Sequence, residues 1–213
     1  EDFVTNILTA STHTTLLVFT DKGKVYWCKV HRLPSANRQS KGKAIANVVQ
    51  LSANEQVRTI LPVEEFSADK NVVLITKNGI IKKTSLENFS NPRPSGIIAL
   101  TIDLDDMLQS AQLTGGKDDI FVCTKEGMSI RFSEDEVRPM GRNARGVKAI
   151  TLGKDDKVIG CEVISPDNKK HILMVTNKGY GKRSETSEYR VQGRGGVGII
   201  TQKVTDKVGE VIS

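Results

Sequence analysis

Four stretches of the sequence share one pattern of hydrophobic and polar positions. Each has four apolar residues, a Thr, two polar residues and a Gly, and then continues into a more polar, often basic run. A short continuous apolar run predicts a strand buried on both faces. The Thr-x-x-Gly after it predicts a tight hairpin turn with the glycine at positive φ. The copies span 16–29, 72–85, 120–133 and 172–185, with turn glycines Gly23, Gly79, Gly127 and Gly179.

A second element follows each hairpin and combines an arginine, a glycine and a short β-prone run. Its copies are 37–51, 91–104, 141–152 and 192–204, aligned on Gly42, Gly96, Gly146 and Gly198. An arginine lies four residues before this glycine in three copies, as Arg38, Arg142 and Arg194. In the remaining copy, Arg93 lies three residues before it.

A third apolar element closes each repeat and completes a unit of about 50 residues. Its copies are 57–63, 107–113, 158–164 and 208–213, with a further copy at 3–10. No stretch has a convincing amphipathic helix period, so the repeat predicts an all-β array with roughly four strands per unit. Four-stranded units of this length are typical of a propeller-like wheel. The predicted blades are 11–61, 62–112, 113–163 and 164–213, with 1–10 ending a preceding blade of a longer wheel.

The signatures of the common propellers are missing. A WD40 array repeats Trp-Asp, whereas the single Trp27 precedes Cys28. The order of elements, with "VRPMGRNARGVKAITL" (137–152) and "TNKGYGKRSETSEY" (176–189), instead resembles the C-terminal domain of the DNA gyrase A protein. The resemblance extends over all 213 residues. The homologous domain in the A protein of topoisomerase IV is the runner-up.

The resemblance implies a β-pinwheel, a propeller-like disc of usually six blades that exchange strands, of which this chain covers about four. It implies a non-catalytic domain of a bacterial type IIA topoisomerase that wraps duplex DNA around a basic rim and supports ATP-dependent negative supercoiling. The implied partners are the N-terminal cleavage core of the same polypeptide and the gyrase B protein, in an A2B2 holoenzyme in the cytoplasm. The domain itself needs no cofactor, because ATP and Mg belong to the holoenzyme. In the topoisomerase IV alternative, the domain selects substrate DNA.

One motif departs from the gyrase pattern. Gyrase is distinguished by a Q-R-R-G-G-[KR]-G box in the first blade. Residues 192–198 match five of its seven positions, with Gly193 in place of an arginine and Val197 in place of a basic residue. Because this stretch lies in a late blade, we expect the box itself outside this chain.

The charge of the chain favours an anionic partner. The net charge is +6 and the pI is about 9.2, and a basic surface attracts polyanions. No apolar run is long enough for a membrane span. The three cysteines lack zinc-ligand spacing, so we interpret them as buried core thiols.

Wrapping requires neutralisation of phosphates along a curved path, which one basic loop per blade supplies. The primary candidates are the arginines of the second element, Arg38, Arg93, Arg142 and Arg194. Their neighbours are Lys41, Lys43, Arg145, Lys148 and Arg190. Basic residues of the hairpin strands extend the track, at Lys82, Lys83, Lys182 and Arg183.

Two other classes of function stay open on the sequence. A protein-interaction wheel would show an apolar patch on one face, and an enzyme would need polar residues converging on a central channel. No histidine, tyrosine or P-loop motif recurs to support catalysis. The acidic pairs at 105–106 and 155–156 are interpreted as turn residues rather than metal ligands.

Overall fold

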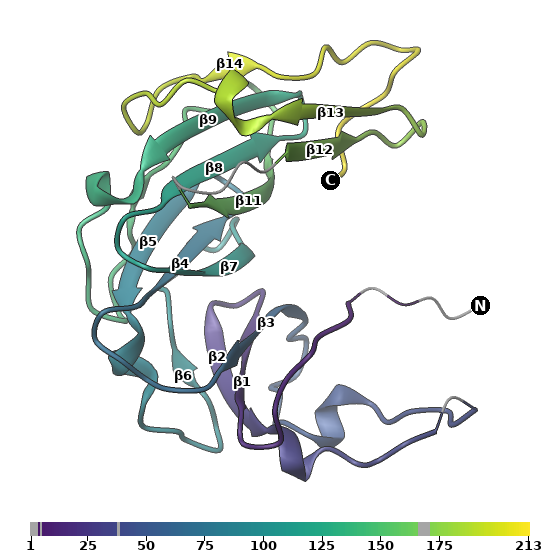
Figure 1. The fold of residues 1–213 in the computed structure, drawn as a ribbon, viewed down its shortest axis with the longest axis vertical. Helices are drawn as coiled ribbons and strands as arrows, with labels where there is room; N and C mark the ends of the chain where they lie inside the picture. The colour runs from purple at the N-terminus through teal and green to yellow at the C-terminus, as the bar shows by residue number, and fades with distance from the viewer. Residues whose placement is uncertain (1–3, 5, 38, 166–170) are drawn as a thin grey trace.

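The computed structural model describes residues 4, 6–37, 39–165 and 171–213. Antiparallel sheets follow one another around an arc that is open on the side where the C-terminus lies (Figure 1). The only helices among the described residues are short 3-10 turns. The prediction of an all-β fold is therefore confirmed. Within these residues, no helix is long and apolar enough to cross a membrane.

Three sheets have four strands and the last has two, and we call them blades 1 to 4. Blade 1 runs β3 (Val57–Val63), β1 (Thr15–Thr20), β2 (Lys24–Lys29), β6 (Ile97–Ile98). Blade 2 runs β7 (Leu108–Thr114), β4 (Asn71–Thr76), β5 (Ile80–Ser85), β10 (Val147–Lys148). Blade 3 runs β11 (Val158–Ile164), β8 (Asp119–Thr124), β9 (Met128–Ser133), β14 (Ile199–Ile200). Blade 4 consists of β12 (His171–Val175) and β13 (Gly181–Glu185). The 3-10 turns are distributed along the chain, as η1 (Val30–Arg32), η2 (Ile45–Asn47), η3 (Leu86–Phe89), η4 (Glu134–Glu136) and η5 (Thr186–Glu188).

Neighbouring blades exchange strands. The last strand of blades 1, 2 and 3 belongs to the second element of the next repeat, as β6, β10 and β14. These strands lie on the outer side of the arc, and β3, β7 and β11 lie on the inner side (Figure 1). The exchange expected of a β-pinwheel is thus present. The predicted blade boundaries fall near the ends of β3, β7 and β11, so each four-stranded sheet crosses one of them.

The hairpin turns form as the Thr-x-x-Gly pattern predicts. In each turn the glycine N–H donates to the threonine carbonyl at 2.9–3.0 Å, and all four glycines have φ between +72° and +82°. In three turns the threonine hydroxyl also accepts the N–H that follows the glycine, as in Thr76 with Ile80 at 3.1 Å. The turn residues therefore fix the register of both strands.

The core lies between blades, which explains the continuous apolar runs. Side chains of a strand alternate between its two faces. In β4, Val72 and Leu74 pack against blade 1, whereas Val73 and Ile75 pack against blade 3. Strand β4 is therefore covered on both faces. The same alternation in β8 places Phe121 in a cluster shared with blade 4.

Two predicted strands differ from expectation. The run after Gly42 forms η2 rather than a strand, because no described strand pairs with it. Strand β12 is partly exposed along its length, unlike β1, β4 and β8. Blade 4 packs on blade 3 through one face, and no described blade covers the other.

Candidate nucleic-acid interface

Four segments on the second elements concentrate the positive charge, and we call them the outer segments. They are 37–51, 90–102, 138–152 and 189–203, and three of them supply the outermost strands β6, β10 and β14. Together they hold eleven lysines and arginines and no acidic residue. The net charge of +6 therefore leaves −5 for the rest of the chain. The positive charge is concentrated where the sheets end on the outside of the arc.

Glycines hold these loops against the preceding blade. Gly146 has φ +92°, and a Cβ there would lie 2.5 Å from the carbonyl oxygen of Ile81. Gly198 has φ +84°, and a Cβ there would lie even closer to the carbonyl oxygen of Ser129. No side chain fits at either place. The arginine-bearing loops therefore bend sharply just before β10 and β14.

Hydrogen bonds connect successive outer segments to one another. The Thr101 hydroxyl donates to the Asn143 carbonyl at 2.9 Å. One repeat later, the Thr151 hydroxyl donates to the Gly195 carbonyl at 2.7 Å. The loops of blades 2, 3 and 4 thus form one connected series along the outer side of the arc.

Most of the sequence-predicted contact residues are accessible. Two are half-buried, Arg142 and Arg194. One, Arg38, lies outside the described residues. The exposed ones are Lys41, Lys43, Arg93, Arg145, Lys148, Arg190, Lys182 and Arg183.

Two of these arginines already have partners within the protein. The Arg145 guanidinium forms an exposed ion pair with Asp103, which directly follows the preceding outer segment. The Arg194 guanidinium donates to the carbonyls of Glu136 and Lys148. Exposed ion pairs contribute little and exchange readily with other anions. Arg145 is thus held near the surface without being sequestered, whereas Arg194 also braces its own loop.

The structure corrects the expectation for Lys82, whose side chain is 0% exposed. Its ammonium donates to the carbonyls of Ala99, Gly141 and Arg142. Burial, with a smaller contribution from the Arg142 charge, lowers the pKa of this ammonium to about 8. Enclosed in this way, Lys82 cannot reach a phosphate.

The expectation for Lys83 is corrected for a related reason. Its ammonium lies 3.3 Å from the Glu134 carboxylate in a buried ion pair, and it also donates to the Glu134 carbonyl at 2.7 Å. Strand β5 pairs with β4 and, like β4, faces blade 1 on one side and blade 3 on the other. Adjacent lysines on opposite faces of this strand are therefore both buried.

Lys83 belongs to a series of contacts between blades. Four residues after each of the first three turn glycines, a side-chain N–H donates to a carbonyl of the 3-10 turn that follows the next hairpin. Trp27 donates to Phe89 at 2.8 Å, and Arg131 donates to Thr186 at 2.7 Å. The residue at this position in blade 4 is Arg183, which is exposed.

Sequence reasoning missed several exposed cations of the same surface. Arg138 lies eight residues before Gly146, as Arg190 does before Gly198, so the repeat register could have identified it. Lys29 and Arg32 could not be found in this way, because they border a pocket that only folding creates.

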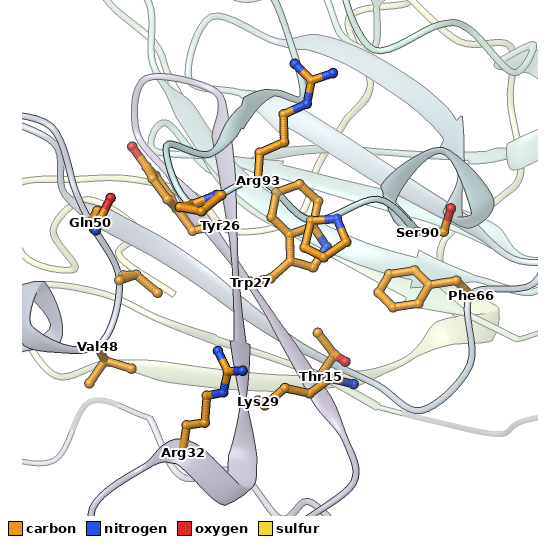
Figure 2. A pocket seen from close by; sticks show the side chains of 13 residues that line it. Thr15, Tyr26, Trp27, Lys29, Arg32, Val48, Gln50, Phe66, Ser90 and Arg93 are labelled. Carbon is orange, nitrogen blue, oxygen red and sulfur yellow. The ribbon is translucent and has the colours of Figure 1, made fainter.

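This pocket has a volume of about 660 Å³ and lies between blades 1 and 2. Figure 2 shows Trp27 within it, with Arg93 and Arg32 on opposite sides. Phe66 adds to its apolar lining. The pocket therefore adjoins the outer segment that carries Arg93.

The acidic pairs have the structural role predicted for them. One Asp106 carboxylate oxygen accepts the N–H groups of Asn78 and Met107 at 2.9 and 2.8 Å. Asp156 does the same one repeat later. In the described part of the chain, no group of three or more His, Cys, Asp or Glu could hold a metal ion. The three cysteines are buried and unpaired, as predicted, and burial raises the pKa of Cys123 to about 12.

Comparison with known proteins gives sequence relatives that are DNA gyrase A proteins. The chain is 44% identical over 212 residues to the DNA gyrase A protein of Salmonella typhimurium, covering 100% of this chain and 24% of that protein. It is 42% identical over 213 residues to the DNA gyrase A protein of Staphylococcus epidermidis, with the same coverage. The chain thus spans about a quarter of the length of these relatives.

Solved structures share the fold over nearly the whole chain. The C-terminal domain of DNA topoisomerase IV matches with a TM-score of 0.83 and 27% identity, covering 94% of this chain and 62% of that one. The DNA gyrase A C-terminal domain matches with a TM-score of 0.80 and 25% identity, covering 95% and 65%. The E. coli ParC C-terminal domain, at 14% identity and a TM-score of 0.72, shows the fold alone.

The family comparison agrees with the repeat and with the strand exchange. The sequence matches the family described as "DNA gyrase C-terminal domain, beta-propeller" over residues 14–64, 70–114, 118–165 and 170–213. The fold is common to gyrase and topoisomerase IV, whereas the sequence relatives named above are gyrase A proteins. This chain belongs to the DNA gyrase C-terminal domain family.

Proposed function

We propose that this chain binds duplex DNA along its outer segments and bends the duplex around the arc. The observation that carries the proposal is the separation of charge, with eleven cations and no acidic residue in the outer segments and a net −5 elsewhere. Neutralising phosphates releases counterions, which supplies most of the affinity of sequence-independent binding. The proposed contacts are the exposed and half-buried cations of these segments, together with Lys182 and Arg183.

The arrangement of the segments favours bending over straight binding. Segments 90–102, 138–152 and 189–203 succeed one another on the outside of a curved array (Figure 1), so a duplex that contacts all three follows the curve. Bending a site costs several kcal/mol and is compensated by the additional backbone contacts that the bend permits. No base-specific contact is required for this, as in other proteins that wrap DNA through its backbone.

Membership in the family supports a role within a larger enzyme. We propose that the domain is non-catalytic and presents bent DNA to the cleavage core of the same gyrase A protein, which works with the gyrase B protein in an A2B2 assembly. ATP and Mg act in that assembly in the cytoplasm, and the bend gives negative supercoiling its direction. The named relatives support this assignment over substrate selection by topoisomerase IV.

Binding to short duplexes across a salt series tests the DNA-binding step. The logarithm of the affinity is expected to fall linearly with the logarithm of the salt concentration, by about 0.9 per phosphate contact. The double variant R142E/R145E is expected to weaken binding about tenfold or more, equally for all sequences, and to reduce the slope.

A matched control carries the same change of charge outside the outer segments. Lys154 and Lys157 are exposed in a loop beside Asp155 and Asp156, and K154E/K157E is expected to bind within about twofold of the parent. A salt-independent affinity, or equal loss in both double variants, would contradict the proposal. A chain that binds no DNA at moderate salt would favour the protein-interaction alternative.

A further inference from the structure

A buried lysine lies directly beneath the most basic outer segment. The Lys82 ammonium is enclosed by three main-chain carbonyls, with Gly141 at 3.1 Å. No carboxylate pairs with it in the described part of the chain. An unpaired buried ammonium costs several kcal/mol unless its hydrogens are all bonded. Here each of its three N–H donors has a carbonyl acceptor.

The three acceptors come from two outer segments. Ala99 directly follows β6, which completes the sheet of blade 1. Gly141 and Arg142 lie in the loop before β10, which completes the sheet of blade 2. A single side chain therefore connects segment 90–102 to segment 138–152, whose cations are Arg138, Arg142, Arg145 and Lys148.

Among the described residues, the carbonyls of Ala99 and Arg142 accept no hydrogen bond other than those from Lys82. The loop is also attached by the Met140 N–H, which donates to the Lys83 carbonyl at 2.8 Å, and by the exposed Arg145–Asp103 ion pair. The remaining links to segment 90–102 come from Thr101, whose hydroxyl donates to the Asn143 carbonyl at 2.9 Å and whose N–H donates to the Ala144 carbonyl at 3.4 Å. Four neighbouring cations repel one another and also repel the Lys82 ammonium. The loop thus needs a fixed attachment to hold its charges in one arrangement.

Among the junctions between blades that the structure describes, only one has this attachment. Three residues after the turn glycine, the other repeats carry Tyr26, Ile130 and Lys182. Tyr26 instead donates to Glu55 at 2.6 Å, and Lys182 is exposed. Among the described junctions, the buried ammonium is therefore specific to that of blades 1 and 2.

We propose that Lys82 is a positioning residue for DNA binding, which fixes the Gly141–Gly146 loop against segment 90–102 so that Arg142 and Arg145 face the phosphates together. This rests on the DNA-binding function proposed above. Lys82 touches no DNA itself and acts only through the two arginines. Because its contribution passes through them, it should vanish when they are removed.

A double-mutant cycle tests this dependence. K82M keeps the length of the side chain and removes the ammonium. It is expected to weaken duplex binding about five- to tenfold in the parent chain, and by less than about twofold in the R142A/R145A background. K154M, which removes one exposed positive charge, is the control and is expected to change binding less than twofold. Equal losses from K82M in both backgrounds, or no loss in the parent, would overturn the proposal.

Amide hydrogen exchange of the loop, measured without DNA, separates this inference from the function on which it rests. K82M is expected to accelerate exchange of Asn143–Gly146 while the strands of blade 3 stay protected. If the parent chain binds no DNA, the proposed function fails, and unchanged exchange in this loop would still overturn the positioning role.

A second variant is available if K82M does not fold. T101V removes the exposed hydrogen bond from the Thr101 hydroxyl to the Asn143 carbonyl with little effect on stability. It is expected to show the same faster exchange in the loop and the same dependence on Arg142 and Arg145. An additive effect of T101V with R142A/R145A would then count against the proposal.

Discussion

At the scale of single residues, the same position in the first three repeats makes one kind of contact with three different side chains. Trp27, Lys83 and Arg131 each donate an N–H to the 3-10 turn that follows the next hairpin. The three side chains are an indole, an ammonium and a guanidinium, and the feature they have in common is an N–H group that can donate a hydrogen bond. Their sequence context indicated surface cations and one aromatic, because the acceptors are main-chain carbonyls about 50 residues away. The physical role of this position becomes visible only when the blades are packed together.

The buried Lys82 makes the stability of the chain depend on pH. Its pKa is about 8 in the folded chain and near 10.5 when unfolded, so between these values the unfolded state binds more protons. The free energy of unfolding is therefore expected to rise with pH in this window, by at most about 3 kcal/mol. Urea unfolding at pH 7.5 and 9.5 measures the rise, which K82M should lack. Parallel pH profiles for the two proteins would contradict this assignment.

At the scale of the elements, exchanged strands hold the arc together. The strands β6, β10 and β14 have two residues each, too few to be stable alone, yet each completes a neighbouring sheet. A glycine at positive φ precedes each of them, and its missing Cβ leaves room for the chain to approach the neighbouring blade. The elements that carry the basic loops are thus also the connections between blades.

A substitution at Gly146 is expected to break one of these connections. G146A would place a Cβ 2.5 Å from the Ile81 carbonyl at φ +92°, which forces β10 away from β5. The expected loss is more than about 1 kcal/mol of unfolding free energy, measured by urea denaturation. G153A is the matched control, since nothing lies within 4 Å of its Cβ position. A G146A chain as stable as G153A would show that β10 tolerates the displacement.

At the scale of the whole molecule, curvature and charge lie on the same side. Three of the four outer segments lie at the outside of the arc, and the chain beyond the outer segments has a net negative charge. On the proposed function, we expect a duplex to be attracted to the outer side and repelled elsewhere, because exposed charges act over about 8–10 Å at physiological salt. We therefore expect the order of the blades to set the path of the bound DNA.

Wrapping with a fixed hand is expected to change DNA topology. Closed circular plasmid is incubated with increasing amounts of the chain and a topoisomerase that relaxes free DNA, and the linking number is measured after protein removal. A shift of one sign that grows with the protein-to-DNA ratio is the expected result. R142E/R145E should give a smaller shift at equal concentration. Tight binding with no shift would show that the chain binds DNA without wrapping it.

The sequence alone determined the repeat, the hairpin turns and the family. The repeat and the turns follow from local rules. A continuous apolar run predicts a buried strand, and a Thr-x-x-Gly predicts a hairpin turn with its glycine at positive φ, whatever the rest of the chain does. It also located most of the basic surface, because exposed Arg93, Arg145 and Arg190 lie in loops whose register the glycines define.

Only the tertiary structure decided which cations are free. Two adjacent lysines, Lys82 and Lys83, are typical of a strand at the surface. In the structure, blades 1 and 3 cover the two faces of β5 and bury both side chains. Lys29 and Arg32 gained a place beside Arg93 because two blades meet there. Burial and juxtaposition depend on residues about 50 positions away, and no local pattern encodes which neighbour will cover a given face.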